Sequence, residues 1–217
     1  MGFALTAKDY SEYLKLACEK IRASGDYITE LDAATGDGDH WANINMGFEK
    51  LAASAPELEN MSLSEEFKKI GMIMMSVIGG SSGVLYGSAY IEAAKTLKDK
   101  ETIGNAELRG LLEGMLTGIM KRGDAKPGMK TMIDALYPAV ECYKRCAADG
   151  EDERTTLEKV KRAALEGAES TRGMEAVRGR ACYQANKGVG HLDPGAVTMS
   201  YQIEVLADYI LSKDVKN

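Results

Sequence analysis

Apolar side chains recur at intervals of three and four residues along nearly the whole chain, which is the spacing that forms one face of an α-helix. Near the N-terminus Tyr10 and Leu14 follow this spacing, and Thr6 stands where a helix N-cap is expected. Ser62 and Glu65 have the spacing of a capping box ahead of another such stretch. Further helices are predicted after Asn105 and at about residues 26–34, 42–54, 83–98, 130–148, 154–170, 172–184 and 196–212.

Strand signals are missing from the same pattern, because no stretch alternates convincingly between apolar and polar residues. The fold class predicted is therefore all-α, a bundle of eight or nine helices. A chain of 217 residues is long enough for one well-packed core. We expect one domain over residues 1–217.

Glycine gathers in four clusters that fall between the predicted helices. These are GDGDH at 36–40, GGSSG at 79–83, GDAKPG at 123–128 and KGVGHLDPG at 187–195. Glycine permits unusual backbone angles and lets a ligand approach the main chain closely. Four such loops predict a binding rim at one end of the bundle, although any single cluster is equally typical of an ordinary helix cap.

The segment LDAATGDGDHWAN carries three closely spaced carboxylates, Asp32, Asp37 and Asp39. Such a group repels itself unless a cation lies among the oxygens, and hard oxygen ligands favour magnesium or calcium. The glycine and glutamate of an EF-hand loop are missing, which favours magnesium bound together with ligand phosphates. An exposed acidic loop is the alternative for the DGD triplet alone. His40 follows at a helix start that suits a phosphate, but a core histidine and a phosphorylated nucleophile stay open for it.

Three later segments add candidate ligand contacts. Ser81 and Ser82 open a helix, where backbone N–H groups and hydroxyls suit phosphate. GDAKPGMKT resembles a P-loop but lacks the Gly-Lys-Thr succession, so that interpretation is rejected. Arg178 and Arg180 place fixed positive charge on the predicted helix at 172–184. The turn at 193–195 reads as an aspartate cap followed by proline in the first helical position.

Composition narrows the function classes. Hydrophobic residues make up 45% and charged residues 28% of the chain, with a net charge of -6 at pH 7. The sequence has no stripe of basic residues, which makes nucleic acid an unfavourable partner, and no apolar run is long enough to span a membrane. The N-terminal stretch does not read as a secretory signal, so a cytoplasmic location with four free cysteine thiols is expected.

Four segments in order resemble the nucleotide-binding L subunit of dihydroxyacetone kinase over essentially the whole chain. They are ELDAATGDGDHWAN, GGSSGVLYG, KPGMKTMIDAL and GRACYQANKGVGHLDPGA. The resemblance implies an eight-helix antiparallel barrel that holds ADP or ATP at one end, with two magnesium ions on Asp32, Asp37 and Asp39. It also implies nucleotide contacts at His40, Trp41, Ala42, Asn43, Ser81, Ser82, Gly123, Met132, Arg180, Asp193, Pro194 and Gly195. The charge of Arg180 would act on the transferred phosphoryl group.

The resemblance further implies a kinase subunit that is active only with a partner. A separate K subunit would hold dihydroxyacetone or a similar short keto-sugar, as in glycerol metabolism, and an M subunit of the phosphotransferase system would recharge the bound ADP. Two departures bear on this: Trp41 replaces a small residue, and Met129 replaces the aspartate of a Gly-Asp-Lys-Thr sequence. The alternatives are an ATP-dependent kinase subunit for another substrate and a non-catalytic nucleotide-binding regulator. Whether the chain forms a homodimer stays open.

Overall fold

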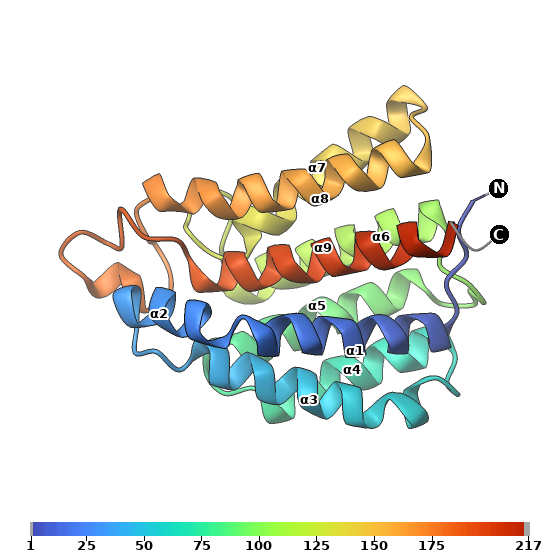
Figure 1. Ribbon diagram of the computed structural model, residues 1–217, viewed down its shortest axis with the longest axis horizontal. Helices are drawn as coiled ribbons and strands as arrows, with labels where there is room; N and C mark the ends of the chain where they lie inside the picture. The colour runs from blue at the N-terminus through green and yellow to red at the C-terminus, as the bar shows by residue number, and fades with distance from the viewer. Residues whose placement is uncertain (1, 215–217) are drawn as a thin grey trace.

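The computed structural model describes residues 2–214, with side chains up to Lys213, and this part of the chain is almost entirely helical (Figure 1). Within it no strand forms, and one antiparallel bridge joins Leu5 to Ile103. The α-helices of the described residues are α1 (Ala7–Ala23), α2 (Gly25–Thr35), α3 (His40–Leu58), α4 (Leu63–Val77), α5 (Gly80–Thr96), α6 (Asn105–Gly123), α7 (Ile133–Asp149), α8 (Glu153–Ser170) and α9 (Pro194–Asp214). The all-α prediction is confirmed.

Side-chain caps fix several of the helix starts. Thr6 and Asp9 form a complete capping box on α1, and Ser62 and Glu65 form another on α4, as predicted. The Asp193 carboxylate accepts a hydrogen bond from the backbone N–H of Ala196 at 2.7 Å and caps α9. Because each cap satisfies N–H groups that a helix leaves without partners, these helix starts are set locally.

Eight of the helices form a closed ring. Going around it, α1 contacts α3, then each helix contacts the next from α3 to α9, and α9 contacts α1 again. The helix α2 lies outside the ring, against α3 and α9. Figure 1 shows that α1 and α2 run in the same direction and that the chain reverses at each later helix. This arrangement is the expected eight-helix antiparallel barrel, and it brings the starts of α3, α5, α7 and α9 to one end.

Aromatic side chains fill the middle of the barrel. Tyr10, Tyr86, Tyr90 and Phe67 are all buried there. Glycine allows α6 to pack closely against α5, because a Cβ atom on Gly118 of α6 would lie 2.4 Å from a backbone oxygen of α5. No helix of the described residues has both the length and the apolar character that a bilayer span requires.

The helix predicted at 172–184 is wrong. The chain makes only two short 3₁₀ turns there, Thr171–Gly173 and Arg180–Tyr183. Gly179 has φ +74°, which breaks a right-handed helix. The helix predicted from residue 130 also starts later, at Ile133, because Lys130 has φ +58°. Both departures lie at the end of the barrel where the glycine clusters gather, so irregular backbone forms the rim of this end.

Candidate functional site

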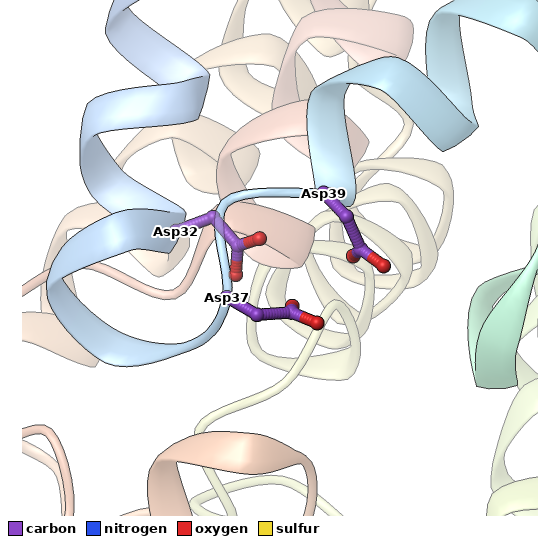
Figure 2. A group of neighbouring side chains, drawn as sticks. All are labelled: Asp32, Asp37 and Asp39. Carbon is purple, nitrogen blue, oxygen red and sulfur yellow. The ribbon is translucent and has the colours of Figure 1, made fainter.

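The three predicted carboxylates come together at the barrel end. Asp32 projects from α2, Asp37 lies in the following loop, and Asp39 precedes α3 (Figure 2). One oxygen from each lies within 4.8 Å of the others. Asp32 is 7% exposed, whereas Asp37 and Asp39 are exposed. One end of the cluster is therefore fixed in the protein and the other is exposed to solvent.

The loop between these aspartates is shaped by glycine and by the Asp32 carboxylate. Gly38 has φ +77°, a conformation that L side chains rarely adopt. A Cβ atom on Gly36 would lie 2.5 Å from Asp32 Oδ1. The other Asp32 oxygen accepts a hydrogen bond from the backbone N–H of His40 at 3.0 Å. The sequence pattern GDGD thus serves a tight turn that places Asp37 and Asp39 over Asp32.

Arg180 provides a counter-charge that sequence spacing did not reveal. Its Nη2 lies 2.7 Å from Asp37 Oδ2 and 3.9 Å from Asp39 Oδ2. The guanidinium comes from the second 3₁₀ turn rather than from the predicted helix. Arg178, predicted beside it, instead donates to the backbone oxygen and the carboxylate of Asp124. The structure therefore separates the two arginines and brings only Arg180 to the carboxylates.

A cavity of about 640 Å³ opens beside the carboxylates. That volume suits a ligand of nucleotide size. Its walls include the starts of α3, α5 and α9 and the residue before α7. The lining residues are Asp32, Thr35, Asp37, Asp39, His40, Asn43, Gly79, Gly80, Ser81, Ser82, Val84, Leu85, Arg122, Gly123, Lys130, Thr131, Met132, Arg178, Gly179, Arg180, Ala181, Asp193, Pro194 and Gly195. Helix N-termini carry partial positive charge and exposed N–H groups, so this end of the barrel favours an anion.

The cavity has a polar and an apolar side. Ser81 and Ser82 lie in the first turn of α5 and line the cavity, where hydroxyls and backbone N–H groups are suited to bind an anion. Gly79 lies tightly against the neighbouring helix, since a Cβ atom there would be 2.7 Å from Asn43 Oδ1. Leu85, Val84 and Met132 line the cavity as apolar groups. The arrangement suits a ligand that is charged at one end and flat and apolar at the other.

The His40 imidazole is hydrogen-bonded in the wall of the cavity. Its Nε2 lies 3.0 Å from Thr198 Oγ1, and that hydroxyl donates to the backbone oxygen of Gly195 at 3.1 Å. The threonine hydrogen is thus engaged, so His40 Nε2–H is the donor of this bond. Burial lowers the pKa of His40, although Asp32 and Asp39 oppose this effect. Of the open alternatives, the structure places His40 in the cavity wall rather than in the barrel core.

The turn at 193–195 closes the far side of the cavity. Asp193 donates its backbone N–H to Thr171 Oγ1 at 2.9 Å while its carboxylate caps α9. Burial raises the pKa of Asp193 to about 7, and the nearby Lys130 works against this rise. Pro194 occupies the first position of α9, as predicted.

Two of the expected contact residues do not line the cavity. Trp41 turns its indole away, donates to the backbone oxygen of Ile21 at 3.0 Å and lies close to Gly25. Ala42 is exposed and also lies outside the cavity wall. The Trp41 ring fills the junction of α1 and α2 instead of the cavity. Any contact at these two positions would have to involve the backbone at the start of α3.

Sequence reasoning missed several residues that the fold brings into the wall, namely Thr35, Arg122, Lys130 and Thr131. Lys130 and Thr131 stand in the segment KPGMKTMIDAL, but the buried position of Lys130 had no signal in the sequence. The segment is folded by Asp134, whose carboxylate accepts from the backbone N–H of Gly128 at 2.5 Å and of Thr131 at 2.8 Å. The aspartate that Met129 replaces is not needed for this turn.

Residues 34–208 match the model of the DAK2 domain. The chain belongs to the DAK2 domain family. Among relatives of this DAK2 chain, the "PEP-dependent dihydroxyacetone kinase, ADP-binding subunit DhaL" of Escherichia coli is 34% identical over 84% of this chain and 87% of its own length. The "PTS-dependent dihydroxyacetone kinase, ADP-binding subunit DhaL" of Lactococcus lactis is 37% identical over 95% of this chain and 99% of its own length.

A solved structure shares the fold of the DAK2 chain. It is the dihydroxyacetone kinase from C. freundii in complex with AMP-PNP and Mg2+, which superimposes with a TM-score of 0.70 at 27% identity. The match covers 91% of this chain but 33% of that kinase, so the DAK2 chain corresponds to about a third of the crystallised protein.

Proposed function

We propose that the chain is the nucleotide-binding subunit of a dihydroxyacetone kinase, which holds ADP or ATP with magnesium and passes a phosphoryl group to a sugar on another subunit. The observation that carries this proposal is the convergence of three carboxylates and of helix N-termini on one cavity. The relatives named as ADP-binding subunits, and the related kinase with AMP-PNP and Mg2+, support it.

The carboxylates fit magnesium. Asp32, Asp37 and Asp39 offer only hard oxygen ligands, and no cysteine or histidine belongs to the group. Two of the three are exposed, which leaves room for phosphate oxygens and water as the other ligands. Bound there, magnesium would neutralise part of the phosphate charge. The ligand set, like the nucleotide contacts, belongs to the proposal.

The chain's own groups would position the phosphates. The first turns of α3 and α5 point N–H groups at the anion, and the Ser81 and Ser82 hydroxyls add donors. Arg180 lies at the exposed end of the carboxylate cluster, where its charge can act on the transferred group. Phosphoryl transfer depends mainly on such positioning and charge neutralisation. No general base is assigned to this chain, because the acceptor hydroxyl belongs to the sugar on the partner.

We assign the sugar site to a separate K subunit and the recharging of ADP to a phosphotransferase-system protein. The names of the relatives specify dependence on phosphoenolpyruvate or on this system, which supports that donor over free ATP. The nucleotide would fill the cavity beside the carboxylates. The acceptor would approach from the partner at the open barrel end.

Reconstitution tests the proposal. The purified chain should bind Mg-ADP in isothermal titration, lose that binding in EDTA, and leave dihydroxyacetone unphosphorylated. Addition of the cognate K subunit and the phosphotransferase donor should restore phosphorylation. Rapid phosphorylation of the sugar by the chain alone would contradict the division of labour, and absence of nucleotide binding would contradict the assignment of the site.

A further inference from the structure

Residues 172–192 form an irregular excursion between α8 and α9, called here the rim segment. Figure 1 shows it projecting beyond the helix ends, next to α2. Its two limbs bond to each other: Gly190 N–H donates to the oxygen of Arg172 at 2.8 Å, and Ala176 N–H donates to the oxygen of Lys187 at 2.9 Å. The segment carries Arg180, and its position therefore decides where that guanidinium lies.

Lys130 reaches from a different loop to the base of the rim segment. Its Nζ donates to the backbone oxygen of Thr171 and to that of His191, each at 2.5 Å. Thr171 directly precedes the segment and His191 lies near its far end, forty-one and sixty-one residues from Lys130 along the chain. One ammonium group therefore joins the limb that leaves α8 to the limb that enters α9.

The surroundings of Lys130 show that this contact is built into the fold. The side chain is 2% exposed although it carries a charge, and a buried ammonium is costly unless it is hydrogen-bonded. Its backbone adopts φ +58°, which a non-glycine residue holds only where neighbours enforce it. Gly188 of the rim segment lies over the stem, since a Cβ atom there would be 3.1 Å from Lys130 Cε.

We propose that Lys130 is a positioning residue that joins the two ends of the rim segment and thereby holds Arg180 at the phosphate end of the cavity. The inference rests on the proposed nucleotide function for its ligand. The junction that Lys130 forms with Thr171 and His191 is a property of the chain alone. Lys130 acts through Arg180, so its removal should weaken contacts with the outer phosphate more than contacts with the rest of the nucleotide.

The test compares Lys130→Met with Lys126→Met. Both changes remove one ammonium from the same loop, but Lys126 is exposed. Titration of Mg-ADP and of AMP measures the affinity for a ligand with and without the outer phosphate. We expect Lys130→Met to lower the affinity for Mg-ADP about tenfold, or ~1.4 kcal/mol. The affinity for AMP should change much less, and Lys126→Met should leave both affinities unchanged.

A double-mutant cycle separates positioning from general support of the fold. In an Arg180→Ala background, Lys130→Met should cause little further loss of Mg-ADP affinity, because the residue it positions is already gone. Equal losses for ADP and AMP, or full additivity with Arg180→Ala, would overturn the proposal. If Lys130→Met fails to fold, Gly188→Ala is the second variant, since its methyl group displaces the rim segment from the Lys130 stem. The same selective loss is expected.

Amide hydrogen exchange, measured without nucleotide, tests the junction at Lys130 independently of the proposed function. Lys130→Met should speed exchange in residues 172–192 relative to the unmodified protein and to Lys126→Met. Unchanged exchange would overturn the junction. If the unmodified protein binds no Mg-ADP while exchange responds as expected, the nucleotide function fails and the junction stands without its assigned ligand.

Discussion

Replacement of Asp37 by asparagine should abolish stabilisation by Mg-ADP while making the protein without ligand slightly more stable. The change keeps the size of the side chain and removes one charge. Two effects oppose each other in the absence of ligand. The carboxylate oxygens lie within 4.8 Å of one another, so loss of one charge relieves two repulsions of about 0.9 kcal/mol each in a water-like dielectric.

The opposing effect is loss of the ion pair with Arg180. The side chains of Arg180 and Asp37 are 64% and 39% exposed, and such an ion pair contributes at most about 1 kcal/mol to the free energy of unfolding. The relieved repulsion, about 1.8 kcal/mol in total, exceeds the lost ion pair, so the free energy of unfolding should rise by about 1 kcal/mol. For a chain of this size that corresponds to roughly 2–4 °C in Tm.

The ligand effect is larger. Mg-ADP at a hundred times its Kd adds about 2.7 kcal/mol to a protein that binds it only when folded, which raises Tm by roughly 5–10 °C. Thermal melts with and without millimolar Mg-ADP measure this difference, and Asp37→Asn should lose it. Asp208→Asn is the matched control. Asp208 lies on α9 and its carboxylate forms an ion pair with Lys161 of α8 at 2.6 Å. A full Mg-ADP shift in Asp37→Asn, or its loss in Asp208→Asn, would refute the reasoning.

Three further substitutions test other parts of the structure. Trp41→Phe should lower the free energy of unfolding by about 1 kcal/mol, because the hydrogen bond to the Ile21 oxygen is lost, yet leave Mg-ADP affinity unchanged. Weaker Mg-ADP binding in this variant would show that the indole contacts the nucleotide. Burial raises the pKa of Glu66 to about 8, so its folded form holds a proton that the unfolded form releases. Stability should therefore fall as pH rises from 5 to 8, and in denaturant titrations Glu66→Gln should remove about 3 kcal/mol of that fall. Gly118→Ala should cost about 1–3 kcal/mol by overpacking, whereas Gly110→Ala on the same helix meets its nearest neighbour at 3.8 Å and should be neutral or stabilising.

Much of the fold could be predicted because its signals are local. The capping pairs at Thr6 and Ser62 and the turn at Asp193 act within one helical turn, so the sequence states them directly. Helical periodicity likewise needs only the neighbours three and four residues away. The false helix at 172–184 marks the limit of this reasoning, because a segment with weak local preference follows whatever tertiary contacts it can make. Those contacts are with Met129, Asp124 and Ala34.

Most of the helices, the aspartate cluster and the glycine-rich rim could be predicted without the structure, since each depends on residues that are close together in the chain. The tertiary structure decided the rest: the closure of α1 against α9, the pairing of Arg180 with Asp37, the buried position of Lys130 and the outward turn of Trp41. These features join groups that lie far apart in sequence, apart from the ring of Trp41. Its direction depends on the space that Gly25 leaves and on the backbone oxygen of Ile21 near the end of α1. Only the packed barrel supplies such partners, because a contact of this kind exists only when the helices have taken their places.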